Sequence, residues 1–144
     1  MPRNESQVEI ARPAAEVFPY LVESDKRRQW VHGLVDSTPL DDGEHRVGSR
    51  FRDVVVDHGQ RTTVEAEVER YEPDDALTAR LEARGFVSRV SYRLQEVDGR
   101  TRVACTLETE FTMRVARLVG PLVTRHAQKA LDGSLQQLKR VLEE

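Results

Sequence analysis

The side chains best suited to chemistry are a histidine near the C-terminus and several polar groups within alternating apolar segments. His126 lies four residues after Leu122, on the flank of an apolar helical stripe, where an imidazole can bind a ligand or transfer a proton near neutral pH. The alternative is a histidine bonded to backbone or water at the edge of the stripe. Tyr92, Ser88 and Thr109 fall on the apolar side of their segments. Tyr92 would anchor a ligand carbonyl or hydroxyl, or else pack its ring with the hydroxyl at a rim.

The sequence shows no recognisable catalytic or metal-binding motif. His32, His45 and His58 are scattered in segments that we interpret as loops, and their spacing is not that of metal ligands. Cys105 is the single cysteine, which excludes an internal disulfide, and we interpret it as a small buried hydrophobe. Nucleophile-elbow, P-loop and dinucleotide fingerprints are missing. We therefore predict no metal ion and no cofactor, and assign no catalytic residue.

Composition limits the partners of the protein. Of its 144 residues 33% are charged, yet the formal net charge is only −3, so no broad field attracts nucleic acid. No apolar segment approaches the roughly 18 residues needed to cross a bilayer, and the N-terminus has no hydrophobic signal core. We expect one domain over residues 1–144, a cytoplasmic location, and no membrane insertion.

Helical periodicity marks both ends of the chain. Over residues 113–144 apolar residues recur every three or four positions, which is typical of a helix with one buried face. Gly120-Pro121 interrupts that run, so we predict a helical lead-in to Val119, a kink, and then a helix of about 22 residues. Near the N-terminus, residues 12–16 open a helix that Pro19 should keep short or bent. A second short helix, capped by Ser24-Asp25, should lead to Trp30.

Period-two alternation dominates the middle of the chain. It predicts a first strand at 7–11 and six more near 34–40, 47–57, 61–71, 76–83, 86–97 and 101–111, several of them separated by Gly- and Asp-rich turns. In four strands one face is apolar and the other charged. The strand around Phe51 is ambiguous, since Asp53 shares its side; we interpret Asp53 as a surface ion pair with Arg50 or Arg52.

These elements predict an α+β fold. A curved seven-stranded antiparallel sheet, with two short helices after its first strand and its concave apolar face covered by the long C-terminal helix, accommodates all of them. Exposed edge strands would allow a homodimer, although nothing in the sequence requires one.

The chain resembles the START-like (SRPBCC) superfamily, whose members have the helix-grip fold, and within it the polyketide cyclase/dehydrase-like family. The resemblance runs over nearly the full chain and rests on four features, none of them a catalytic signature. These are IARPAAEVF at residues 10–18, Trp30, VGSRF at residues 47–51, and LQQLKRVLE at residues 135–143.

This resemblance implies an internal cavity between sheet and helix that holds an apolar or aromatic small molecule. We expect its ligand-contacting wall to include Trp30, Phe51, Ser88, Val90, Tyr92, Thr109, Val119, Leu122, Val123 and His126. The leading hypothesis is binding or carriage of a lipid, polyketide or isoprenoid. One alternative is a polyketide aromatase/cyclase or dehydratase in which His126 and Tyr92 act together. Another is a protein-interaction module with a filled core.

Overall fold

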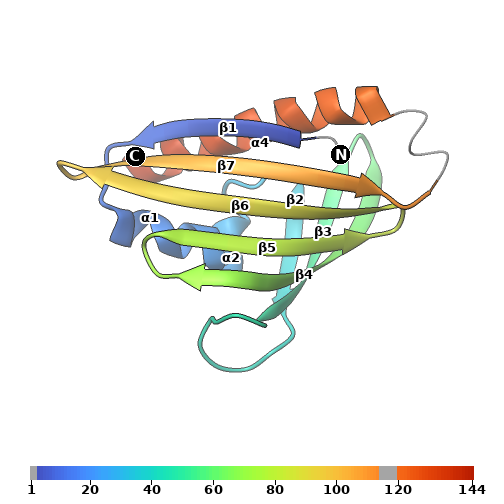
Figure 1. Ribbon diagram of the computed structural model, residues 1–144, viewed down its shortest axis with the longest axis horizontal. Coiled ribbons are helices and arrows are strands. Elements are labelled where there is room, and N and C mark those ends of the chain that lie inside the picture. Colours follow the sequence, from blue (N-terminus) through green and yellow to red (C-terminus); the bar gives the residue numbers. More distant parts are fainter. Residues whose placement is uncertain (1–2, 114–119) are drawn as a thin grey trace.

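The computed structural model describes residues 3–113 and 120–144 (Figure 1). The elements follow one another as β1 (Arg3–Ile10), α1 (Ala14–Val22), α2 (Ser24–Arg27), β2 (Leu34–Pro39), β3 (Arg50–Asp57), β4 (Gln60–Glu72), β5 (Ala76–Ala83), β6 (Phe86–Val97), β7 (Arg100–Phe111) and α4 (Gly120–Glu143). No helix in these ranges is both long and apolar enough to span a bilayer.

The seven strands form one antiparallel sheet in the order β1-β7-β6-β5-β4-β3-β2. Every neighbouring pair from β2 to β7 is consecutive in the chain and joined by a turn or loop, whereas β1 is added at the far edge beside β7. Tight turns at His58-Gly59 and Asp98-Gly99 use positive φ angles, which match the twist of a hairpin. The predicted helix-grip fold is confirmed.

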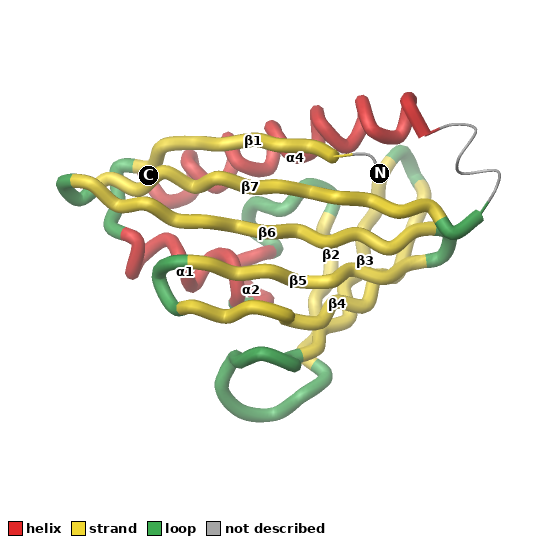
Figure 2. Tube along the Cα trace, viewed as in Figure 1, coloured by secondary structure: helices red, strands yellow, loops and turns green. Residues whose placement is uncertain are grey.

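The sheet curves mainly along β4. Residues 60–67 of β4 pair with β3, while residues 65–72 pair with β5, so the two partners share only three positions. A register shift between Val68 and Arg70 adds local twist to the same strand. As a result β2 and β3 run steeply across the direction of β5, β6 and β7 (Figures 1 and 2). This bend makes the concave face deep enough to enclose a space.

Two strands begin three or more residues from their predicted starts. β1 starts at Arg3 and not at residue 7, because its polar residues also pair with β7 and bond to α4: the Asn4 side chain donates to the Thr124 carbonyl at 3.0 Å. β3 starts at Arg50 and not at residue 47. Gly48 has a φ of 94°, outside the range of a strand, and leaves Val47 exposed.

The two helices after β1 are short, as predicted. α1 continues past Pro19 because the carbonyl of that residue still accepts the Glu23 N–H at 2.9 Å. The predicted cap of α2 is wrong: Glu23 is the N-cap residue, without a side-chain cap, and the Ser24 hydroxyl lies 3.1 Å from that of Ser37 instead. α2 ends at Arg27, three residues before Trp30.

The C-terminal helix α4 runs alongside β1 and spans about 36 Å at 1.5 Å per residue (Figure 1). Pro121 lies in its first turn, where a missing N–H leaves no helical bond unmade. Leu135 and Leu138 have 1% and 0% of their surface exposed and pack into the core with Ile10 and Val103. The predicted lead-in to Val119, and with it the kink, lies outside the described residues.

Packing of α4 should dominate the stability of the fold. We expect Leu138→Ala to lower the free energy of unfolding by about 2–5 kcal/mol, because it removes buried methyl groups and leaves a void. Leu122→Ala, the same change at an exposed position of the same helix, should alter it by less than about 0.5 kcal/mol. Urea unfolding followed by the fluorescence of Trp30, the single tryptophan, measures both. Equal losses would contradict this assignment of the faces.

Candidate functional site

A cavity of about 210 Å³ lies between the concave face of the sheet, the segment from α1 to β2, and α4. Most of its wall is aliphatic or aromatic, and polar side chains contribute at four positions. Its lining residues are Leu21, Val22, Arg27, Trp30, Val31, Leu34, Phe51, Asp53, Val55, Val64, Ala66, Val68, Leu77, Ala79, Leu81, Val90, Tyr92, Leu107, Leu131 and Ser134. A mainly apolar hollow with few polar groups is the usual form of a small-molecule site.

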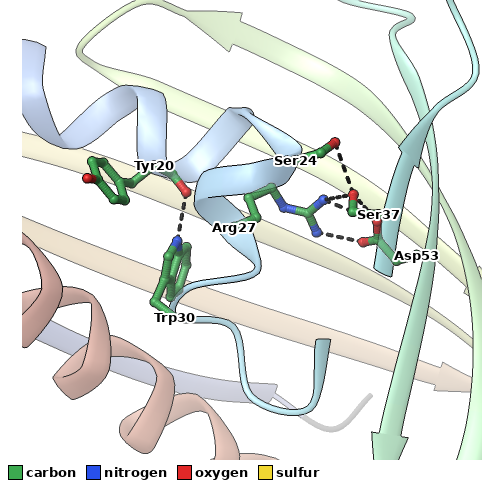
Figure 3. A network of polar contacts seen from close by, with 6 residues as sticks. All are labelled: Tyr20, Ser24, Arg27, Trp30, Ser37 and Asp53. Carbon is green, nitrogen blue, oxygen red and sulfur yellow. Dashed lines mark hydrogen bonds and ion pairs between the residues drawn. The ribbon is translucent and has the colours of Figure 1, made fainter. Parts of the chain in front are cut away.

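Four of the residues predicted to contact a ligand lie on this wall: Trp30, Phe51, Val90 and Tyr92. The indole N–H of Trp30 donates to the Tyr20 carbonyl at 2.7 Å, which fixes the ring at the end of α1 (Figure 3). The Tyr92 ring meets the Trp30 ring edge to face, with centroids 6.1 Å apart. Together the two rings make a rigid aromatic part of the wall.

Two predicted polar contacts bond to each other and do not line the cavity. The hydroxyls of Ser88 and Thr109 are 3.0 Å apart, across the β6–β7 pair. This mutual hydrogen bond satisfies Ser88, which is buried on its strand. Neither side chain therefore needs a ligand.

The predicted contacts from the start of α4 also lie off the wall. Leu122 and Val123 are 66% and 39% exposed, and Val119 lies outside the described residues. His126 is exposed and bonds the carboxylate of Asp57, where β3 ends. The alternative in which His126 and Tyr92 act together has no support in this geometry, because His126 bonds Asp57 at the surface and Tyr92 lies on the cavity wall.

The polar part of the wall centres on an ion pair between Arg27 and Asp53 (Figure 3). The guanidinium donates to both carboxylate oxygens, at 3.2 Å and 2.6 Å, and to the Ser37 hydroxyl at 3.1 Å. Ser37 lies 2.7 Å from the same carboxylate, and its oxygen is also near Ser24. The Arg27 guanidinium also lies over the Phe51 ring, 5.9 Å from its centroid.

This geometry corrects the predicted role of Asp53. Its side chain is only 5% exposed and its cationic partner is Arg27, whereas Arg50 and Arg52 bind Glu65 on the outer face. The alternation placed Asp53 on the apolar side of β3, and that placement was the signal of a buried partner. Arg27 could not be identified from spacing, because α2 is one turn long and has no apolar stripe.

Tyr92 lies opposite Cys105 in the β6–β7 register. Burial raises the pKa of the Tyr92 phenol, and the neighbouring thiol raises it further. Burial also raises the pKa of Cys105 to about 12. Both groups are therefore protonated at neutral pH, so the phenol is a neutral hydrogen-bonding group and the thiol is not a nucleophile.

The comparisons with known proteins agree with this architecture. The model of the family described as "Polyketide cyclase / dehydrase and lipid transport" matches residues 1–143. The chain belongs to this family. Membership supports binding of a hydrophobic ligand at a general level. A search of curated proteins gave no match.

Solved structures share the fold at low sequence identity. The protein TTHA0849 from Thermus thermophilus is 17% identical, with a TM-score of 0.83 and 99% and 97% of the two chains covered. A START superfamily protein from Mycobacterium smegmatis is 18% identical, with a TM-score of 0.83 over 98% of this chain and 97% of the other. DynU16, encoded in the dynemicin biosynthetic locus, is 18% identical with a TM-score of 0.71; the match covers 99% of this chain and 48% of DynU16.

The ion pair yields a stability prediction. Asp53→Asn should lower the free energy of unfolding by about 3 kcal/mol, because it leaves the Arg27 guanidinium buried without its counter-charge. Glu65→Gln is the matched control: it removes a carboxylate from exposed pairs with Arg50 and Arg52 and should cost less than about 1 kcal/mol. Urea unfolding compares the two. A loss for Asp53→Asn no larger than that of the control would refute a structural role for the pair.

Proposed function

We propose that the protein binds and carries a small, neutral, hydrophobic molecule that bears one hydroxyl or carbonyl group. The observation that carries the proposal is an apolar cavity whose wall includes a charge-neutral polar cluster, Arg27 with Asp53, and a protonated phenol, Tyr92. Family membership over residues 1–143 supports a hydrophobic ligand of this general kind.

The cavity volume limits the size of the ligand. At about 210 Å³ it is smaller than the roughly 300–1,000 Å³ of sites for drug-sized ligands. It is larger than an apolar cavity of about 150 Å³ that accommodates benzene. These limits favour a single substituted ring or a short isoprenoid over a multi-ring polyketide. They also argue against an interaction module with a filled core.

The charges on the wall favour a neutral polar group on the ligand. Asp53 already neutralises Arg27, so a ligand carboxylate would add an uncompensated negative charge to an apolar space. A neutral hydroxyl or carbonyl avoids this cost. It can accept a hydrogen bond from Tyr92, or from an Arg27 N–H group that remains outside the bidentate contact.

The protonation of the wall supports binding without turnover. Acid–base catalysis needs a group whose pKa lies near the working pH. Of the titratable groups beside the cavity, Tyr92 and Cys105 have raised pKa values, and the Asp53 carboxylate is engaged by Arg27 and Ser37. We therefore assign these residues to orienting a ligand.

A matched pair of ligands tests the proposal. A single-ring terpenoid alcohol should raise the melting temperature and bind in calorimetry, and the carboxylic acid of the same skeleton should bind at least tenfold more weakly at pH 7. Tyr92→Phe should reduce this preference by removing a hydrogen-bond donor. Tighter binding of the acid would refute the assigned polarity. No binding by any ring- or isoprenoid-sized compound would refute the proposal itself.

A cavity-filling variant tests the location of the ligand. Ala79→Phe places a ring inside the wall from β5 and should abolish binding, because the cavity has no room for both ring and ligand. Ala104→Phe makes the same change on β7, one residue from the inward-facing Val103 and Cys105 and thus on the opposite face, and should leave binding intact. Binding that survives Ala79→Phe in a folded protein would place the ligand elsewhere.

A further inference from the structure

Three histidines that are far apart in the sequence gather around one aspartate at the surface. Asp57 ends β3, His58 follows it in the β3–β4 turn, and His126 lies in the second turn of α4. His32 approaches from the loop between α2 and β2. We call these four residues the histidine cluster. The fold alone brings them together, because their positions span 95 residues of the chain.

The potential ligand atoms in the cluster are close together. One atom each from Asp57, His58 and His126 lies within 4.8 Å of the other two. The Nε2 atoms of His32 and His58 are 3.5 Å and 3.7 Å from Asp57 Oδ1, and His126 Nε2 bonds Oδ2. Ligands on a tetrahedral ion with bonds of about 2.0–2.2 Å are separated by roughly 3.4 Å. For Asp57, His58 and His126, small side-chain rotations therefore suffice to converge on one ion, whereas His32 is not part of this 4.8 Å group.

The donor set identifies the class of ion. Imidazole nitrogens with one carboxylate suit Zn²⁺ and similar transition metals, whereas Mg²⁺ and Ca²⁺ need mostly oxygen ligands. A neutral imidazole can donate its lone pair to a metal.

We propose that the histidine cluster is a binding site for Zn²⁺ or a similar divalent transition ion, with Asp57, His58 and His126 as ligands and His32 as the fourth. Its ligands come from a loop, a strand end, a turn and a helix. A bound ion therefore cross-links the start of α4 to the β3–β4 turn. The ion stabilises the folded protein, because the unfolded chain does not hold these ligands together. The site is separate from the cavity, whose lining includes none of the four residues.

Calorimetry on the untagged, chelator-stripped protein tests the site. We expect one Zn²⁺ per chain at pH 7.5, a higher melting temperature with Zn²⁺, and neither effect with Mg²⁺ at the same concentration. Binding should weaken by at least tenfold at pH 5.5, because protonated imidazoles cannot ligate a metal. Absence of Zn²⁺ binding at pH 7.5 would overturn the proposal.

Variants locate the ion. His58→Ala and His126→Ala should each weaken Zn²⁺ binding by at least about tenfold, since loss of a ligand costs no less than loss of a group that only orients one. His45→Ala is the control: this histidine stacks on Phe51, away from the cluster, and its loss should leave Zn²⁺ affinity unchanged. Co²⁺ titration reads the same site through its visible absorption, independently of stability. Unchanged affinity in folded His58→Ala and His126→Ala, or a loss as large in His45→Ala, would overturn the assignment.

Discussion

The buried ion pair between Arg27 and Asp53 is the contact on which the rest of the hollow depends. α2 is a single turn with no buried residue, so apolar packing cannot hold it against the sheet. Its guanidinium does so by a bidentate bond to β3 and a further bond to Ser37 on β2. A charge at this depth needs a partner, so the ion pair holds the short helix against β2 and β3. The position of α2 brings Arg27 to the cavity wall. It also places Trp30, three residues after the helix, on the same wall.

The cavity stays open because hydrogen bonds hold the segment from α1 to β2 and helix α4 in place around it. Trp30 is bonded to the end of α1, and Ser134 on α4 accepts the backbone N–H of His32 at 2.9 Å. α4 itself is held along β1 by polar contacts and by Leu135 and Leu138 in the core. Collapse onto the free volume would break these bonds in a low-dielectric interior, where unsatisfied polar groups are costly. Rigid polar contacts around an apolar space are thus what keep it open.

Sequence reasoning succeeded where information is local. Alternation placed Val64, Ala66 and Val68 inside and the glutamates between them outside, and the 3.6-residue period identified the buried leucines of α4. It failed where groups meet only through the tertiary fold. Asp53 is an acid on the apolar face of its strand, which is visible in the sequence, whereas no sequence pattern indicates that Arg27 is its partner. The histidine cluster had no signal at all, because no spacing along the chain encodes the meeting of a loop, a turn and a helix.

The cavity and the histidine cluster both include residues of the loop between α2 and β2. Val31 lines the cavity and the next residue, His32, belongs to the cluster, while the N–H of His32 is bonded to Ser134 on the cavity wall. An ion that fixes His32 therefore also restrains Val31 and Ser134, and a ligand that displaces either of these residues disturbs the ion. By thermodynamic linkage, the change that the ion makes in the affinity for the ligand would equal the change that the ligand makes in the affinity for the ion. The loop between α2 and β2 would carry such coupling, since His32 within it is two residues from Trp30 on the cavity wall.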